Sequence, residues 1–146
     1  MLYPTNGARL YIADAPADEV GAYPGSGWVE IGETEALGLL GVEWEQIDTA
    51  DVEANAVGVL KGVMIRQPME ILLGNDPTDA GQRLIWAASR SRQSYPFRLL
   101  FPGGSVTRRW FALVMSIGEV FDSANSVIKL QVALQPTSDI LRSEDA

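Results

Sequence analysis

Two alternating apolar segments joined by a tight turn constrain this sequence more than any other feature. Residues 95–101 carry aromatic and aliphatic side chains at every second position, so these side chains share one face of a β-strand. Pro102-Gly103-Gly104 follows and predicts a hairpin turn, because glycine adopts positive φ without steric cost. The returning segment, residues 105–117, is apolar on both faces near its end, which is typical of a strand covered on both sides.

Several shorter segments also have strand character. They are residues 9–13, 28–32, 42–48, 69–73 and 126–134. In the third of these, Val42 and Trp44 alternate with glutamates, which predicts a half-buried strand with Trp44 in the core. The last segment is expected to point its aliphatic residues inward: Ile128, Leu130, Val132 and Leu134.

One helix is predicted to begin at residue 76. Asp76 suits the N-cap, Pro77 suits the first helical position, and Asp79 adds negative charge near the positive end of the helix dipole. The predicted apolar stripe consists of Ala80, Leu84, Ala87 and Ala88. The basic residues expected toward the other end of the dipole are Arg83, Arg90 and Arg92. We expect this helix to pack on the sheet.

These elements predict a mainly β (α+β) fold. One helix among six to eight strands, with no repeated β-α-β unit, indicates an antiparallel β-sandwich or barrel with one packed α-helix and a long mid-chain loop. The chain has 146 residues, which is enough for one hydrophobic core and too few for two. We therefore expect a single domain over residues 1–146, with a C-terminal tail over residues 136–146.

The composition argues against several classes of function. The sequence has no cysteine and no histidine, which removes disulfides, thiol nucleophiles, Cys/His zinc sites and histidine-based acid–base catalysis. A formal net charge of −8 argues against a general nucleic-acid binder. Phosphate-binding loops and nucleophile elbows have no matching motif, and no apolar run is long enough to span a membrane. We expect no enzyme activity, no cofactor, no metal and no membrane partner.

The charges are distributed unevenly along the chain. Residues 1–55 hold eleven acidic side chains and one basic one, whereas residues 56–112 hold eight basic and three acidic ones. If these segments form different surfaces, one molecule carries a negative and a positive patch, which suits head-to-tail self-association. If they interleave in three dimensions, the patches cancel.

Two acidic groups could carry chemistry, and both are better explained as solvated or interface faces. Glu43 and Glu45 lie on one face of a predicted strand and could form a glycosidase pair. Asp48, Asp51 and Glu53 could hold a hard cation but lack the spacing and central glycine of an EF-hand. Trp28 follows a glycine-rich loop, and of the tryptophans it is the one predicted to lie at an interface.

Residues 51–67 form an unusual apolar segment interrupted by Gly58 and Gly62. Such a segment is either an inner hairpin of the domain or an arm whose apolar side chains need a partner, and we favour the arm. Its predicted subunit-interface residues are Val57, Val59, Leu60, Lys61, Val63, Met64 and Arg66.

The order of motifs in residues 76–136 resembles the major tail tube proteins of long-tailed bacteriophages, in particular the lambda-like siphophage type. The resemblance depends on the helix with Gly81-Gln82-Arg83, the turn Phe101-Pro102-Gly103-Gly104-Ser105, the strand from Trp110 to Met115 and the following Ser116-Ile117-Gly118. The lambda-like protein carries an additional C-terminal immunoglobulin-like domain, which we do not expect in this chain because it ends at Ala146.

The resemblance implies a structural virion protein. Such subunits form homo-hexameric rings that self-assemble into a stacked tail tube on a tape-measure protein, with further tail-end proteins, in the host cytoplasm. Viral DNA passes through the lumen during ejection without specific binding, and a negative wall would repel it over about 8 Å at physiological salt. The lumen candidates are Glu30, Glu43 and Glu45.

Other functions remain open at this point. A secretion-system tube protein of the same fold would have the same sequence features. A small β-sandwich ligand-binding module would instead need a pocket with convergent polar groups, and a carboxylate-based enzyme would need its acids in a cleft.

Overall fold

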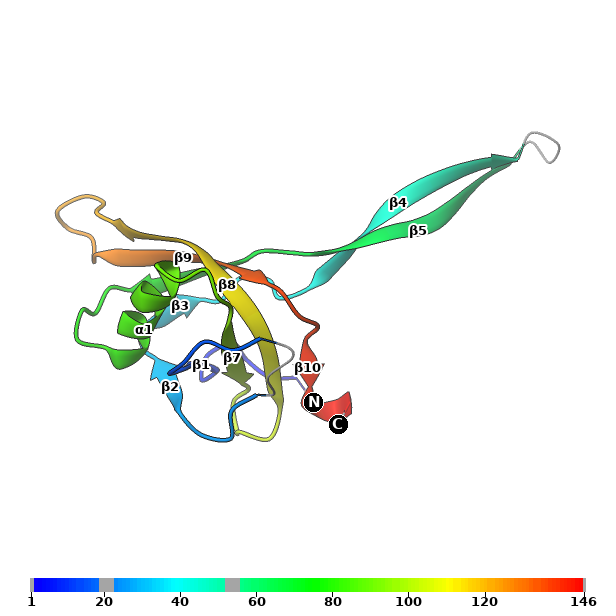
Figure 1. Cartoon of the computed structure of the whole chain (residues 1–146). Coiled ribbons are helices and arrows are strands. Elements are labelled where there is room, and N and C mark those ends of the chain that lie inside the picture. The colour runs from blue at the N-terminus through cyan, green and yellow to red at the C-terminus, as the bar shows by residue number, and fades with distance from the viewer. Residues whose placement is uncertain (1, 19–22, 52–55, 146) are drawn as a thin grey trace.

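The computed structural model describes residues 2–18, 23–51 and 56–145 (Figure 1). The elements are, in chain order, β1 (Arg9–Ala13), β2 (Trp28–Ile31), β3 (Thr34–Ala36), β4 (Val42–Asp51), β5 (Ala56–Arg66), β6 (Met69–Gly74), α1 (Ala80–Ser89), β7 (Tyr95–Leu100), β8 (Thr107–Val120), β9 (Lys129–Pro136), β10 (Leu141–Arg142) and a 3₁₀ turn (Ser143–Asp145). No helix within these ranges is long and apolar enough to cross a membrane.

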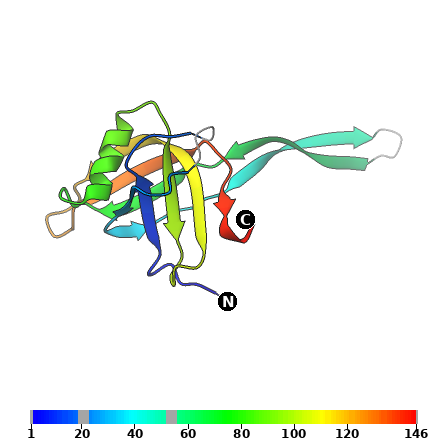
Figure 2. The same cartoon turned by 60° about the horizontal axis from the view of Figure 1, so that its bottom comes forward.

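The strands form two antiparallel sheets. The larger has the order β2-β1-β7-β8-β9-β6-β3, with β10 on β8, and the smaller consists of β4 and β5. Strand β8 pairs with β7 through its first half and with β9 through its second. A register shift between Val114 and Ser116 interrupts the second pairing, and such bulges bend a strand. The long β8 curves between the two halves of the sheet (Figure 2), which confirms the predicted mainly β architecture with one helix.

The core lies between the two halves of the large sheet and α1. Phe97 of β7 and Trp110 of β8 are fully buried, with stacked rings 6.1 Å apart. From the second half, β6 and β9 contribute alternating buried residues: Met69, Ile71, Leu73, Leu130, Val132 and Leu134. The burial predicted for Leu130, Val132 and Leu134 is confirmed. The prediction for Ile128 is wrong, because β9 begins at Lys129 and this side chain stays exposed in the preceding turn.

The helix begins later than predicted. Asp79, not Asp76, is the N-cap: its backbone is extended (φ −72°, ψ 126°) and its Oδ2 accepts a 3.0 Å hydrogen bond from the Gln82 amide. The same oxygen accepts the Gly32 amide from the loop after β2, so a tertiary contact fixes the start. The Asp76 carboxylate instead accepts from the amide and hydroxyl of Thr78. Pro77 therefore precedes the helix.

The buried face of α1 also differs from the predicted stripe. Of the predicted residues only Ala88 is buried; Ala80 and Ala87 are exposed and Leu84 is half-buried. The buried residues are Gly81, Gln82, Ile85 and Ala88. Alanine fits either face of a helix, and glutamine is a polar residue that is not expected in a core. The prediction from apolar periodicity therefore assigned the wrong face of the helix to the contact with the sheet. Arg90 follows the helix as its C-cap, and Arg92 lies beyond it.

Candidate assembly interface

Strands β4 and β5 form a long hairpin that projects away from the body of the molecule (Figures 1 and 2). Their register runs from Val42 opposite Arg66 to Asp51 opposite Ala56, with a shift between Trp44 and Gln46. We call this hairpin, residues 42–66, the arm. An isolated two-stranded hairpin is marginally stable in water, which makes the arm a candidate for contact with a further surface.

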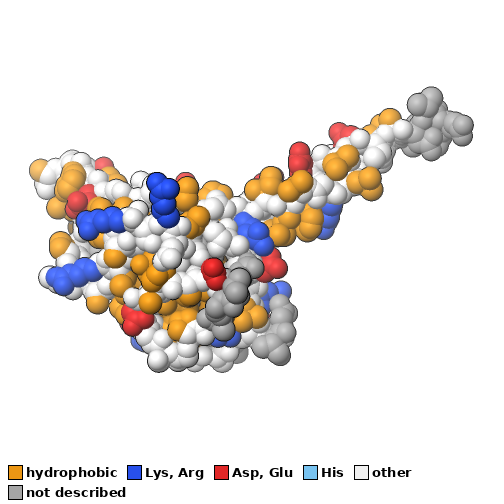
Figure 3. All heavy atoms as spheres, viewed as in Figure 1, with side chains coloured by type: hydrophobic (Ala, Val, Ile, Leu, Met, Phe, Trp, Pro, Cys, Tyr) orange, Lys and Arg blue, Asp and Glu red, His pale blue; other side chains and the backbone are white. Residues whose placement is uncertain are grey.

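The arm exposes apolar side chains on both of its strands. On β5, Val57 and Val59 are 73% and 63% exposed, and on β4, Trp44 is 45% exposed. Figure 3 shows hydrophobic side chains along the visible face of the arm. Exposed apolar surface of this kind makes the arm a candidate interaction site.

The predicted interface residues all lie on β5. Val57, Val59, Leu60, Lys61 and Val63 are exposed, and Met64 is half-buried. Lys61 lies 5.1 Å from the centre of the Trp44 ring, where its ammonium contacts the aromatic face. Arg66 has a different position, because it turns to the body of the molecule and forms an ion pair with Asp139.

Sequence reasoning missed the contribution of β4. The prediction that Trp44 belongs to the core is wrong, and the segment that contains it is no half-buried strand, because Val42, Trp44 and Ile47 are all exposed on the arm. The arm predicted over residues 51–67 therefore starts nine residues earlier, at Val42. The sequence did contain a signal for this longer arm. A strand pattern begins at Val42, shortly before the apolar segment, so the two could have been paired as one hairpin.

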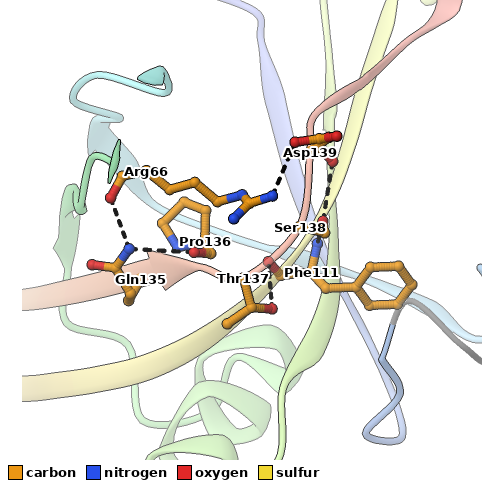
Figure 4. A network of polar contacts seen from close by, with 7 residues as sticks. All are labelled: Arg66, Phe111, Gln135, Pro136, Thr137, Ser138 and Asp139. Atoms are coloured by element: carbon orange, nitrogen blue, oxygen red, sulfur yellow. Dashed lines mark hydrogen bonds and ion pairs between the residues drawn. The ribbon is translucent and has the colours of Figure 1, made fainter. Parts of the chain in front are cut away.

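A polar network holds the root of the arm against the body (Figure 4). The Gln67 amide donates to the Gly41 carbonyl at 3.1 Å, which closes the hairpin base. The Gln135 side chain of β9 donates to the Arg66 carbonyl at 2.8 Å, and the Arg66 guanidinium donates to the Asp139 carboxylate at 3.0 Å. The arm is thus anchored to β9 and to the chain that follows it.

The predicted C-terminal tail packs along the first half of β8. The Thr137 amide donates to the Phe111 carbonyl, and the Phe111 amide donates to the Ser138 hydroxyl. Farther on, β10 pairs with β8 at Arg108 and Arg109. The Arg108 guanidinium holds the Glu144 carboxylate through two hydrogen bonds of 2.8 and 2.9 Å and keeps the pKa of that carboxyl below its ordinary range.

A second exposed apolar group lies at the opposite end of the molecule. The connection between β8 and β9 exposes three large side chains: Phe121, Val127 and Ile128. In both views this connection and the arm lie at opposite ends. One subunit thus has two separated apolar surfaces, an arrangement that suits head-to-tail association.

The lumen candidates lie on two different parts of the fold. Glu30 is on the edge strand β2, 3.7 Å from the Arg9 guanidinium, and Tyr11 and Glu30 together raise the pKa of Arg9. Glu43 and Glu45 are exposed on β4 of the arm. The structure does not bring these three glutamates together.

Glu43, Glu45 and Asp48 lie exposed on β4 of the arm. No group of three or more potential ligands in the described parts of the chain could hold a metal ion. Asp48 accepts a hydrogen bond from the Gln46 side chain at 2.9 Å, whereas Glu53 lies outside the described residues. An open surface concavity of about 390 Å³ lies on the outer face of β6, β8 and β9.

The comparisons with known proteins identify the fold. No family model and no curated protein matches the sequence. Among solved structures, the chain is similar to the sheath/tube terminator of the extracellular contractile injection system PVC, with a TM-score of 0.71 at 12% identity over 98% of this chain and 97% of that one. It is also similar to the SPP1 tail tube, with a TM-score of 0.69 at 14% identity over 97% of this chain and 78% of that one.

The chain has the fold of tail-tube proteins. The tail of a gene transfer agent particle gives the same result, with a TM-score of 0.69 at 13% identity over 96% of this chain and 98% of that one. This tail-tube fold agrees with the resemblance of residues 76–136 and extends it over nearly the whole chain. The matched proteins are parts of assembled tubes and tails, which are structural proteins and not enzymes.

Proposed function

We propose that this protein is the subunit of a viral tail tube, in which hexameric rings stack into the conduit for DNA ejection. The observation that carries the proposal is the arm, a hairpin with exposed apolar side chains on both strands and no cover from its own domain. The tail-tube fold supports it, and the similar gene-transfer-agent tail was determined with C6 symmetry. The protein would belong to the virion and assemble in the host cytoplasm with tape-measure and tail-end proteins.

The energetics favour assembly through several contacts at once. Burying four aliphatic side chains of the arm would contribute on the order of 6–12 kcal/mol before costs. Association alone costs roughly 4–15 kcal/mol in lost translational and rotational freedom. One arm contact therefore leaves little surplus, and a closed ring, in which every arm is seated, is the stable arrangement.

The proposal includes the lumen. A bore lined by Glu30, Glu43 and Glu45 would repel DNA phosphates and let the genome pass, and this assignment stays a prediction. Glu30 is the strongest of the three candidates because it lies on the large sheet, whereas the orientation of Glu43 and Glu45 depends on where the arm docks.

A secretion-system tube is the second candidate. The similarity of this chain to the sheath/tube terminator of the contractile injection system PVC favours it. The lambda-like siphophage type is likewise a prediction, since the similar structures include both phage tails and injection systems. Reconstitution with DNA-filled particles or with a sheath protein would separate the two candidates.

The decisive experiment removes the apolar surface of the arm. The double variant Val59→Ser with Leu60→Ser should abolish rings and tubes in negative-stain micrographs and sedimentation, yet leave the melting temperature of the monomer nearly unchanged, because both side chains are already exposed. The matched control is Leu2→Ser with Leu39→Ser, which removes exposed leucines outside the arm. Wild-type protein that stays monomeric at all concentrations and salt conditions would refute the proposal.

Amide exchange provides a second readout. The amides of β5 should exchange quickly in the monomer and become protected in the tube, since a two-stranded hairpin is marginal by itself. Strong protection of β5 in the monomer would show that the arm needs no partner.

A further inference from the structure

Two arginines lie directly opposite each other on the outer face of the large sheet. Arg98 of β7 pairs in register with Arg109 of β8, and Tyr11 of β1 pairs with Arg98 on the other side. Their strand neighbours Phe97 and Trp110 are fully buried in the core, so the arginines point away from it. We call Arg98 and Arg109 the arginine pair.

Aromatic rings hold the arginine pair in place. The Arg98 guanidinium lies 4.3 Å from the centre of the Tyr11 ring and 5.0 Å from that of Trp28. The Arg109 guanidinium lies 5.2 Å from the centre of the Tyr23 ring. Both arginines are half-buried, and Nε of Arg98 is buried without a hydrogen-bond partner. Stacking on these rings restricts the movement of the guanidinium groups.

The arginine pair lacks a counter-charge within residues 2–18, 23–51 and 56–145. Four cations in these ranges have one: Arg9 with Glu30, Arg66 with Asp139, Arg108 with Glu144 and Lys129 with Glu35. The described side chains of Lys61, Arg83, Arg90 and Arg92 form no ion pair either, but they are exposed to solvent, whereas the arginine pair is half-buried. Like charges directly opposite each other on adjacent strands destabilise a sheet, so this pair costs stability in the isolated subunit. A carboxylate placed between the two groups would relieve the repulsion and could bind through paired hydrogen bonds.

The complementary charges are on the arm. Glu43, Glu45 and Asp48 project from β4, are exposed, and form no ion pair in the described structure. The arm extends away from the body in both views, so β4 cannot reach the arginine pair of its own chain. A second copy of the chain can supply these acids.

We propose that the arginine pair is the docking site for the acidic strand β4 of a second copy. The inference rests on the proposed tube assembly and adds the surface of the neighbouring subunit on which the arm docks. Charge complementarity selects this occupant: the partner must be acidic, and the arm offers three acids alongside apolar side chains that need burial. Glu43 and Glu45 then belong to a contact between subunits, which leaves Glu30 for the lumen.

Complementary charge reversal tests the docking. Variant A carries Arg98→Glu with Arg109→Glu, and variant B carries Glu43→Arg with Glu45→Arg. Each variant alone should need about tenfold or more protein to assemble, because like charges then meet at every contact. An equal mixture of A and B should assemble as readily as wild type, since each arm then finds an opposite charge on the other variant. The matched control is Arg83→Glu with Arg92→Glu, which makes the same charge change on exposed arginines elsewhere.

The outcomes separate this inference from the proposed function. If wild type, A and B assemble equally well, the docking site is wrong and the tube proposal stands. If A fails while B assembles normally, the arginine pair binds another acidic partner, such as a phosphate backbone or a different tail protein, and the inference is overturned. If wild type never assembles, the proposed function itself fails.

A neutral variant covers the case in which A does not fold. Arg98→Gln with Arg109→Gln removes the repulsion together with the cation–π contacts, so these two effects oppose each other and the monomer should melt near the wild-type temperature, while assembly weakens and loses most of its salt dependence. Improved or unchanged assembly of this folded variant would also overturn the inference.

Discussion

Replacing Gly81 by alanine should destabilise the protein, although the same change stabilises most helices. Gly81 is the second residue of α1 and is buried against β2. A Cβ at this position would lie 2.6 Å from Cα of Ile31 and closer still to the carbonyl oxygen of Glu30. Both atoms belong to the backbone of a paired strand, so they cannot move aside as a side-chain end can.

The magnitude follows from two opposing terms. Alanine gains about 1 kcal/mol over glycine within a helix. Restoring ordinary contact distance requires the helix to retreat from β2 by about 1 Å, and overpacking of this kind costs about 1–3 kcal/mol. The retreat also stretches the hydrogen bonds from the Gly32 amide to Asp79 and from Gln82 to the Gly32 carbonyl, each worth about 1 kcal/mol. We expect a net loss of about 2 kcal/mol.

Urea unfolding of the monomer, followed by tryptophan fluorescence, measures this difference. Gly118→Ala is the matched control, because a Cβ there meets nothing within 4 Å and the exposed strand position should gain a few tenths of a kcal/mol. A Gly81→Ala protein as stable as wild type, or more stable, would refute the argument that α1 and β2 are in backbone contact.

Two further predictions concern polar contacts. Gln82→Leu should lower the free energy of unfolding by about 2–4 kcal/mol in the same titration, because the buried side chain donates to the carbonyls of Gly32 and Gly74 and accepts from the Asp76 amide. A loss below about 1 kcal/mol would contradict this. The lowered pKa of Glu144 means that its stabilising contribution is present above the ordinary carboxyl pKa and is lost as pH falls through the lowered value. Amide exchange in β10 should therefore accelerate below about pH 4, and Glu144→Gln should remove that response.

Much of the large sheet could be predicted because its signals are local. The alternation in residues 95–101 and the Pro102-Gly103-Gly104 turn determine β7, β8 and their pairing without reference to the rest of the chain. The start of α1 could not be predicted in this way. Asp76 and Asp79 both suit an N-cap, and the choice depends on the Gly32 amide, which comes from a distant loop.

The candidate interface was predicted in part for a related reason. An alternating strand has the same pattern whether its apolar face meets its own core or another molecule, so Trp44 could not be assigned from periodicity. The arginine pair was invisible in the sequence, because Arg98 and Arg109 come together only through the register of β7 and β8. Signals that depend on pairing between strands appear only when the fold is known.

The hydrogen bonds and the ion pair around Arg66 set the angle between the arm and the body of the molecule. Strand β5 has 11 residues, which at about 3.3 Å per residue gives a length of roughly 36 Å. A rotation of about 5° at the root moves the far end by roughly 3 Å, close to the rise of one strand residue. The hydrogen bond from Gln135 and the ion pair with Asp139 lie at the root, so they would limit this displacement of the far end. The bending stiffness of an assembled filament would be adjustable at these few side chains without any change to the surface that the arm touches.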